Sequence, residues 1–192
     1  MKSRVRNAVL VAAVYALLSL VFVPQAYGYT LTGQHIGADL WYRPYVEFTA
    51  ESREGMRQAM STWNKYLPVG QRACFDNTSH YLTSYPQNDG LCRIYKTHLG
   101  DFNYVAQNTW WYNPATGATS SSDIDINANY SWANGAAPGR YDVQTIVLHE
   151  IGHSVGLDHS GNSNAVMYAY AYTNTTKRSL HSDDINGVQS IY

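Results

Sequence analysis

The chain has 192 residues, of which 14% are aromatic and 14% charged, and its formal net charge is −1. This length suffices for one domain with a substantial core, and the aromatic content argues against global disorder. The charge is close to balanced and forms no basic stripe, so nothing indicates a nucleic-acid-binding protein.

The first 28 residues are typical of a secretory signal peptide. Their start is basic, with Lys2, Arg4 and Arg6. An uncharged apolar run follows over residues 8–23, and Ala26 and Gly28 place small side chains at positions −3 and −1 of a cleavage site. The run is shorter than the roughly 20 residues that span a bilayer, which disfavours an uncleaved anchor. We therefore predict a secreted, extracellular domain over residues 29–192 with no stable membrane association.

Two cysteines, Cys74 and Cys92, lie within this predicted domain. An oxidising extracellular compartment favours joining them, and a loop of this length would gain about 3 kcal/mol from the bond. The alternative is a free thiol that binds zinc and keeps the protein latent. We predict the Cys74–Cys92 disulfide.

The first half of the mature chain predicts one strand and one helix. Residues 40–48 are rich in aromatic and β-branched side chains, and Pro44 suggests an edge strand or a bulge. Thr49 can cap a helix over residues 51–67. One face of that helix is apolar at helical spacing, through Met56, Met60, Trp63 and Leu67.

Residues 71–100 are the least regular part, with turn clusters and a short strand candidate over residues 91–95. His80 and His98 are candidates for a second metal site. Isolated histidines in a loop-rich region are, however, more often ordinary surface residues, so we assign them no ligand role.

Two further strands are predicted before the most informative motif. Residues 104–113 are rich in aromatic side chains, and residues 123–127 alternate polar and apolar side chains with period two. Asp123 and Asp125 would share one face of the second strand. They could bind Ca²⁺ through oxygen ligands or form a solvated strand face. Calcium thus stays possible, without assigned ligands.

The segment from His149 to His159 reads H-E-x-x-H-x-x-G-x-x-H. In a helix over residues 143–155, His149 and His153 lie one turn apart on the same face and can bind one metal ion. Gly156 can adopt the left-handed conformation that ends a helix, which returns the chain so that His159 supplies a third nitrogen. Three neutral imidazoles leave one position of a tetrahedral zinc open for water, as in a catalytic site.

Glu150 lies beside these ligands and is predicted to act as the general base. Zinc polarises a carbonyl group and lowers the pKa of its bound water. Glu150 would activate this zinc-bound water and pass the proton to the leaving amine. H-E-x-x-H alone is a short pattern, but the added glycine and third histidine make a chance match much rarer. We predict a zinc-dependent endopeptidase that hydrolyses peptide bonds of protein substrates.

Two alternatives belong to other classes of protein. One is a secreted zinc-containing peptide-binding module without catalysis, for which loss of the glutamate would be the sequence sign. The other is an extracellular adhesion or structural domain, suggested by the 17 tyrosines.

The remaining elements are a capped helix start and a C-terminal helix. Asp142 is suited to cap the metal-binding helix. Ser182 is predicted to cap a final helix over residues 183–192, with Asp183 and Asp184 in its first turn, where the helix dipole favours negative charge.

Three segments together resemble the matrixin family of metzincin zinc endopeptidases, that is, the matrix metalloproteinase-like catalytic domain of peptidase family M10. They are residues 149–160 (HEIGHSVGLDHS), 165–168 (AVMY) and 182–192 (SDDINGVQSIY). The match covers roughly residues 100–192, and Ser160 after the third histidine supports this branch of the clan.

The resemblance implies an α+β, metzincin-like fold. It would have a twisted mixed β-sheet, an active-site helix with a second helix behind it, and a small lower subdomain with a C-terminal helix. It also implies zinc ligands His149, His153 and His159, general base Glu150, and Met167 as an apolar floor beneath the metal.

For substrates, the resemblance implies proteins or peptides bound in extended form along a sheet edge, which the 104–113 strand would supply. Residues 168–182 would shape the pocket for the side chain that follows the scissile bond. A monomer is expected.

The chain also departs from the family pattern. Ala169 stands where a proline usually follows the methionine turn, and no cysteine-switch segment or histidine-rich loop for a structural zinc is recognisable. We therefore expect one catalytic zinc ion and no second zinc.

Overall fold

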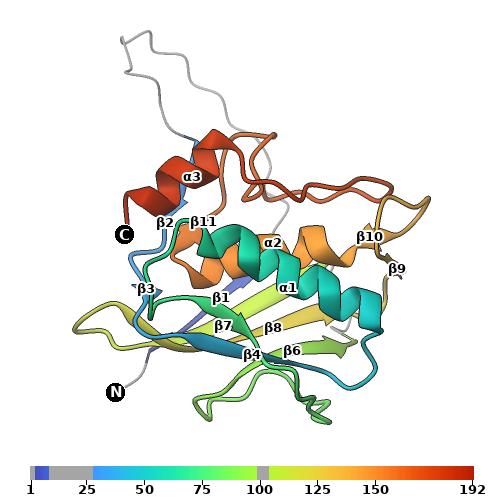
Figure 1. The fold of residues 1–192 in the computed structure, drawn as a ribbon, viewed down its shortest axis with the longest axis horizontal. Coiled ribbons are helices and arrows are strands. Elements are labelled where there is room, and N and C mark those ends of the chain that lie inside the picture. The colour runs from blue at the N-terminus through green and yellow to red at the C-terminus, as the bar shows by residue number, and fades with distance from the viewer. Residues whose placement is uncertain (1–2, 9–27, 99–103) are drawn as a thin grey trace, which may run out of the picture.

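A computed structural model describes residues 3–8, 28–98 and 104–192 (Figure 1). In these residues a seven-stranded mixed sheet runs in the order β1-β7-β8-β6-β4-β5, with β3 beside β8. Its strands are β1 (Ser3–Ala8), β3 (His35–Ile36), β4 (Leu40–Pro44), β5 (Ala73–Phe75), β6 (Cys92–Thr97), β7 (Ala106–Tyr112) and β8 (Ala118–Asn127). β4, β5, β6 and β8 pair in parallel, whereas β7 is antiparallel to β8. The mixed sheet predicted from the resemblance is thus confirmed.

Helices α1 (Ala50–Asn64) and α2 (Val143–Ser154) pack against each other over one face of the sheet (Figure 1). Thr49 caps α1 as predicted, accepting a hydrogen bond from the N–H of Ser52. The apolar face of α1 is buried in the core through Met56, Met60 and Trp63. The indole N–H of Trp63 also donates to the carbonyl of Leu148 at 2.8 Å, which fixes α2 on α1.

The first predicted strand is shorter than expected and lies inside the sheet. β4 pairs with β5 through Tyr42 and with β6 as far as Pro44, where it ends. Pro44 is therefore the last residue of an interior strand. At this position its missing N–H removes no hydrogen bond between β4 and the strands on either side. The prediction of an edge strand or a bulge is wrong.

The predicted disulfide is also wrong, because Cys74 and Cys92 are free thiols in the structure. Cys74 on β5 and Cys92 on β6 flank β4, opposite Trp41 and Tyr42 respectively. Two strand spacings of about 4.8 Å separate them, beyond the reach of a disulfide. Trp41 and Tyr42 are neighbours in the strand, so the two thiols also point to opposite faces of the sheet.

The second face of the sheet is polar but not solvated. Asp123 and Asp125 are fully buried there, contrary to a solvated strand face. Asp123 accepts hydrogen bonds from the N–H groups of Gln87 and Arg93, and Asp125 from the N–H of Thr97. The segment between β5 and β6 covers this face, which is why the strand is buried on both sides.

Short elements complete the fold. They are β2 (Thr30–Leu31) paired with β11 (Leu157–Asp158), β9 (Trp132–Ala133) paired with β10 (Tyr141–Asp142), and helix α3 (Ser182–Gln189). The N-cap of α3 is His181, not Ser182 as predicted. His181 forms a capping box. Its ring accepts a hydrogen bond from the N–H of Asp183, and the N–H of His181 donates to the carboxylate of Asp184.

The N-terminal segment is only partly described. Ser3–Ala8 form β1, antiparallel to β7, so this part of the predicted signal peptide pairs with the sheet. An edge strand offers unpaired backbone groups to any extended segment, which accounts for this pairing. Residues 9–23 of the apolar run predicted over residues 8–23 lie outside the described residues. Among the residues that the structure describes, no helix is long and apolar enough to cross a membrane.

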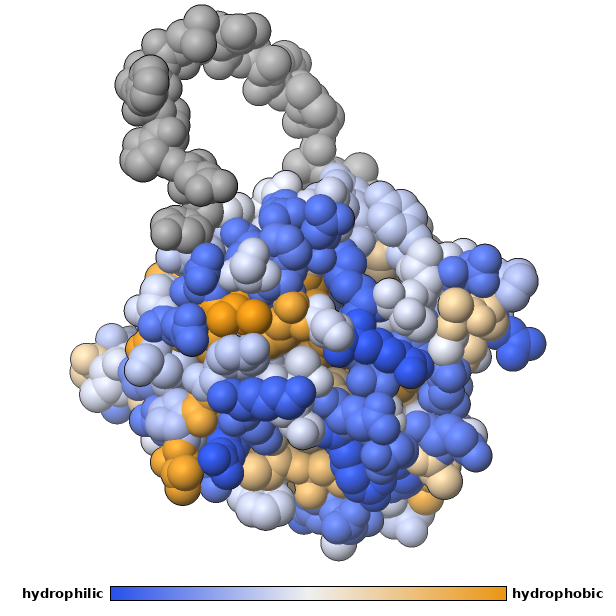
Figure 2. Space-filling view, turned by 45° about the horizontal axis from the view of Figure 1, so that its top comes forward, coloured by the Kyte–Doolittle hydropathy of each residue, from blue (hydrophilic) through white to orange (hydrophobic). Residues whose placement is uncertain are grey.

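One face of the molecule is shown in Figure 2. It is predominantly hydrophilic, with hydrophobic residues visible in small separate patches. The large apolar side chains are instead collected between the sheet and the two long helices, where Trp63, Tyr42, Ile94 and Ile124 are fully buried.

Candidate metal centre

The start of α2 is fixed by a buried carboxylate. Asp142, the predicted N-cap, accepts hydrogen bonds from the N–H and the hydroxyl of Thr145 at 3.0 and 2.7 Å. Arg178 donates to both of its carboxylate oxygens at 2.9 and 2.6 Å. Burial raises the pKa of Asp142, but these bonds outweigh it and leave the pKa below its ordinary value. The ionised cap thus ties the helix to the segment that follows the metal motif.

The C-terminal half of α2 is held by β7. The side-chain amide of Asn108 donates to the carbonyl of Glu150 at 2.6 Å and to the hydroxyl of Ser154 at 2.8 Å. The ring of Trp110 stacks near His153, with a centroid separation of 6.3 Å. Sequence reasoning missed Asn108, which is one of two adjacent amide residues in β7.

The turn after α2 requires glycine. Gly156 has a φ of 108°, and a β-carbon there would overlap the carbonyl oxygen of Gln34. The carbonyl of Gly156 accepts from the N–H of Thr32 at 2.9 Å, and β11 then pairs with β2. These contacts turn the chain back and place His159 opposite α2, as the motif predicts.

His149, His153 and His159 come together in the structure. One ring nitrogen of each lies within 4.8 Å of those of the other two. The ring centroids are 4.9 to 5.3 Å apart. These are the three residues that the sequence predicts as metal ligands.

Backbone carbonyls orient two of these rings. Nδ1 of His149 donates to the carbonyl of Val166, and Nδ1 of His153 donates to that of Leu157, each at 2.8 Å. A carbonyl only accepts, so the proton is on Nδ1 and the lone pair is on Nε2, the form that binds a metal. The Nε2 atoms of His149 and His159 are buried without a hydrogen-bond partner. Such orphaned lone pairs fit a metal ion.

The three rings are neutral at physiological pH. Burial and the neighbouring rings hold the pKa of His149 well below its ordinary value, and burial with His159 lowers that of His153 to about 3. Burial also lowers the pKa of His159. Neutral imidazole is the ligand form, so the site needs to release few protons when it binds a metal.

Glu150 lies between the histidines in sequence and is only 1% exposed. Its Oε2 atom is buried with no hydrogen-bond partner, and burial raises its pKa to about 8. An unpaired buried carboxylate is costly and is typical of groups that handle protons.

Met167 lies in the turn after His159. It is fully buried and packs against Gly152 in the middle of α2. The carboxylate of Asp184 accepts from the N–H groups of Val166 and Met167 at 2.8 and 3.0 Å. The sequence predicts Asp184 in the first turn of the last helix, where the helix dipole favours negative charge and N-capping accounts for it. Its second role, holding the methionine turn, depends on a contact across 17 residues that no local pattern reveals.

Ser160 and Asp183 link the third histidine to α3. The hydroxyl of Ser160 donates to Asp183 at 2.7 Å, and its N–H donates to the carbonyl of Met167. The other carboxylate oxygen of Asp183 accepts from the N–H of Gly28 at 2.7 Å.

The other candidate ligands do not join the triad. The Nε2 atom of His80 bonds the carbonyl of Ile94, and the ring of His98 bonds Asn129. In the part of the chain that the structure describes, the triad is the one group of histidine, cysteine or acidic side chains arranged to hold a metal. Asp123 and Asp125 are thus not grouped with a third such ligand.

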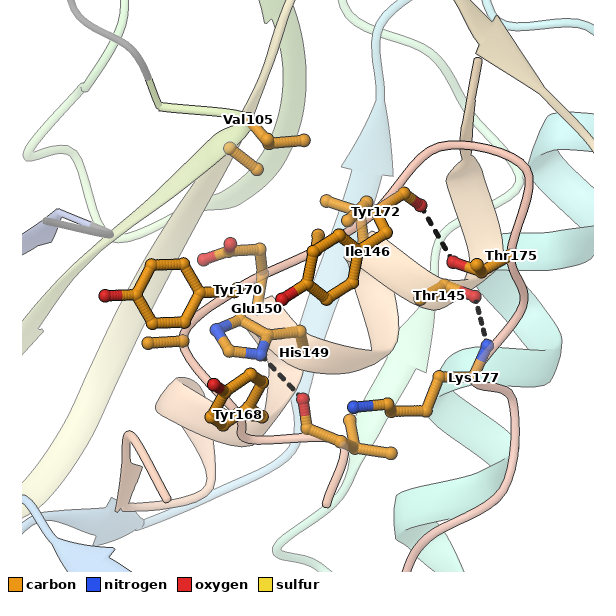
Figure 3. Close-up of a pocket in the computed structure, with 14 residues that line it drawn as sticks. Val105, Thr145, Ile146, His149, Glu150, Tyr168, Tyr170, Tyr172, Thr175 and Lys177 are labelled. Atoms are coloured by element: carbon orange, nitrogen blue, oxygen red, sulfur yellow. Dashed lines mark hydrogen bonds between the residues drawn. The ribbon is translucent and has the colours of Figure 1, made fainter. Parts of the chain in front are cut away.

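A pocket opens beside His149 and Glu150 (Figure 3). It encloses about 550 Å³ of space, part of it open to solvent. Apolar side chains from β7, α2 and the segment after the methionine turn form most of its walls. Besides the two site residues, its lining comprises Val105, Ala106, Thr145, Ile146, Val166, Tyr168, Ala169, Tyr170, Ala171, Tyr172, Thr175 and Lys177. The predicted pocket segment 168–182 thus does contribute to a cavity at the site.

Comparison with known proteins places this site in a family. Residues 44–192 match the Peptidase M10 model, described as Matrixin. Matrix metalloproteinase-27 of Tupaia belangeri is 28% identical over 174 residues, which cover 86% of this chain and 32% of the relative. Neutrophil collagenase of Homo sapiens is 42% identical over 71 residues, or 36% of this chain and 15% of the relative. The chain spans about a third or less of the length of these curated relatives. It belongs to the matrixin family.

Proposed function

We propose that this chain is a secreted zinc-dependent endopeptidase that hydrolyses peptide bonds of protein substrates. The observation that carries the proposal is the convergence of three neutral histidines on one point, beside a buried glutamate and an open pocket. His149, His153 and His159 would hold the zinc ion on which this family depends. When bound, zinc supplies a Lewis acid that polarises the scissile carbonyl and makes water more acidic.

Glu150 is proposed as the general base. Its Oε2 atom takes the proton of the attacking water and later returns it to the leaving amine. Its support is local: the carboxylate is next to His149 in α2, lines the pocket, and has one oxygen free of hydrogen bonds. Asn108 holds the backbone carbonyl of Glu150, which keeps the carboxylate on the pocket side of the helix.

Substrate would bind in extended form along β7. In the structure this edge is already paired with Ser3–Ala8, in antiparallel register with residues 107–112. The pairing supports the view that the edge accepts an added strand. Removal of residues 1–28 by signal cleavage would free the edge for substrate.

Secretion and the boundary at residue 29 belong to the same proposal. They rest on the basic start, the apolar run and the small residues before position 29. Expression of the full chain in a secreting host, followed by N-terminal sequencing of the exported protein, tests both.

Casein cleavage by the zinc-loaded exported protein tests the activity. We expect cleavage that a chelator abolishes and added zinc restores. Glu150→Ala should keep the zinc content and lower the rate by about 10²–10⁴-fold, because it removes only the proton carrier. Cleavage that persists with chelator would contradict the proposal. A folded, zinc-loaded wild type that binds peptides without cleaving them would favour the non-catalytic binding module.

A further inference from the structure

One cation stands out in the pocket beside the metal centre. Among its lining residues, Lys177 is the one basic side chain other than the metal-binding histidine. It runs along the pocket wall toward Tyr168 and His149 (Figure 3). Glu150 is the one acidic residue of the lining, and the remaining walls are alanine, valine, isoleucine, threonine and tyrosine.

The ammonium group of Lys177 is held by two carbonyl groups and makes no direct ion pair, although the charge of Asp184 acts on it from a distance and raises its pKa against the effect of burial. It donates to the carbonyls of Ser163 and Ala165 at 2.9 and 2.7 Å, and it lies 5.6 Å from the ring centre of Tyr168. An ammonium group has three donors, so one remains for a ligand. None of the ion pairs between described residues includes Lys177.

We propose that Lys177 makes this pocket select glutamate as the residue that follows the scissile bond. A carboxylate entering a largely apolar pocket loses hydration and is tolerated only where a charged donor meets it. Lys177 supplies that donor on the wall, and the methylene groups of glutamate fit the apolar lining. Leucine fills the same walls without using the charge, and lysine brings two like charges together. This inference rests on the proposed endopeptidase function and specifies the substrate class of that site.

The test uses internally quenched peptides that differ only in this residue: glutamate, glutamine, leucine or lysine. Wild type is compared with Lys177→Met, which removes the charge, and with Lys177→Gln, whose amide can still donate to the two carbonyls. Lys65→Met is the matched control, because Lys65 lies at the end of α1 and removal of its charge alters net charge equally. The measured quantity is the ratio of kcat/KM for the glutamate peptide to that for the leucine peptide. This ratio cancels any common effect on the metal centre.

In wild type and Lys65→Met the glutamate peptide should be cleaved at least as well as the leucine peptide. Both Lys177 variants should lower the ratio by about 10- to 100-fold, as expected for loss of a charge-assisted hydrogen bond. An unchanged ratio in both variants would overturn the proposal. So would preference for leucine over glutamate in wild type.

Binding separates this inference from the proposed activity. In the Glu150→Ala background, the dissociation constants of the same peptides can be measured without turnover. Tighter binding of the glutamate peptide that depends on Lys177 would support the selectivity even if no peptide were cleaved. Cleavage of all peptides without such dependence would leave the endopeptidase intact and reject the role of Lys177.

Discussion

Gly152 lies so close to Met167 that a β-carbon at position 152 would overlap the methionine sulfur. Gly152 is the second variable residue of H-E-x-x-H, between the two helical histidines, and Met167 is fully buried. Helix α2 can therefore approach the methionine turn this closely only because position 152 has no side chain. The separation between α2 and the turn sets where Val166 can accept the hydrogen bond of His149.

Gly152→Ala should consequently destabilise the protein and weaken zinc binding. In an unhindered helix the same substitution would add about 1 kcal/mol of stability through helix propensity. Overpacking against a buried side chain instead costs about 1–3 kcal/mol, so the sign of the change identifies the contact. Urea unfolding and zinc titration measure the two effects. Gly55→Ala in α1 is the matched control. Its β-carbon would lie 3.3 Å from the β-carbon of Gln144 and 3.7 Å from the Cα and N atoms of that residue, so this mild crowding should offset the gain in helix propensity and change stability little.

The structure predicts that both cysteines are free thiols, in place of the Cys74–Cys92 disulfide expected from the sequence. The purified protein should carry two titratable thiols after unfolding, and a reducing agent should leave its melting temperature unchanged. In the folded state a maleimide should label the partly exposed Cys74 faster than Cys92. Cys92 is 4% exposed, and burial raises the pKa of its thiol to about 12. A mass two hydrogens lower, with a reductant-sensitive melting temperature, would contradict the strand order.

Asp123 should make stability decrease as the pH rises toward neutrality. Burial raises its pKa to about 7, although the N–H groups of Gln87 and Arg93 donate to it. Between its unfolded pKa of about 3.9 and this value the folded state binds more protons than the unfolded state. The free energy of unfolding therefore falls across that window and levels off above it.

Comparison of Asp123→Asn with wild type isolates this effect. The variant should show a flatter dependence of unfolding free energy on pH between 5 and 7.5, while zinc-linked changes are common to both proteins. Asp76→Asn is the control with the opposite sign. The hydrogen bonds from Thr78 and Arg43 outweigh burial and lower the pKa of Asp76, so its contribution is present at neutral pH and is lost on acidification. Parallel pH profiles for wild type and Asp123→Asn would exclude the buried carboxylate as the source.

The features that could be predicted from the sequence are those that depend on local interactions. The spacing of His149, Glu150 and His153 works within one helix, and Gly156 supplies the positive φ that returns His159, so the triad was predictable without a fold. Thr49 and Asp142 cap helices through bonds to residues three positions away, and both were identified.

Features that depend on contacts between distant segments could not be predicted before the fold was known. Whether Cys74 and Cys92 could meet depended on β4 lying between their strands, and whether Asp123 was solvated depended on the segment that covers it. Three further features also join residues from separate elements. They are the hydrogen bond of Asp184 to the methionine turn, the hydrogen bonds of Asn108 to α2, and the position of Lys177 in the pocket lining. Local sequence patterns determine backbone dihedral angles and the faces of helices. Strand order and loop packing depend on the whole chain, and they determine the surroundings of each side chain.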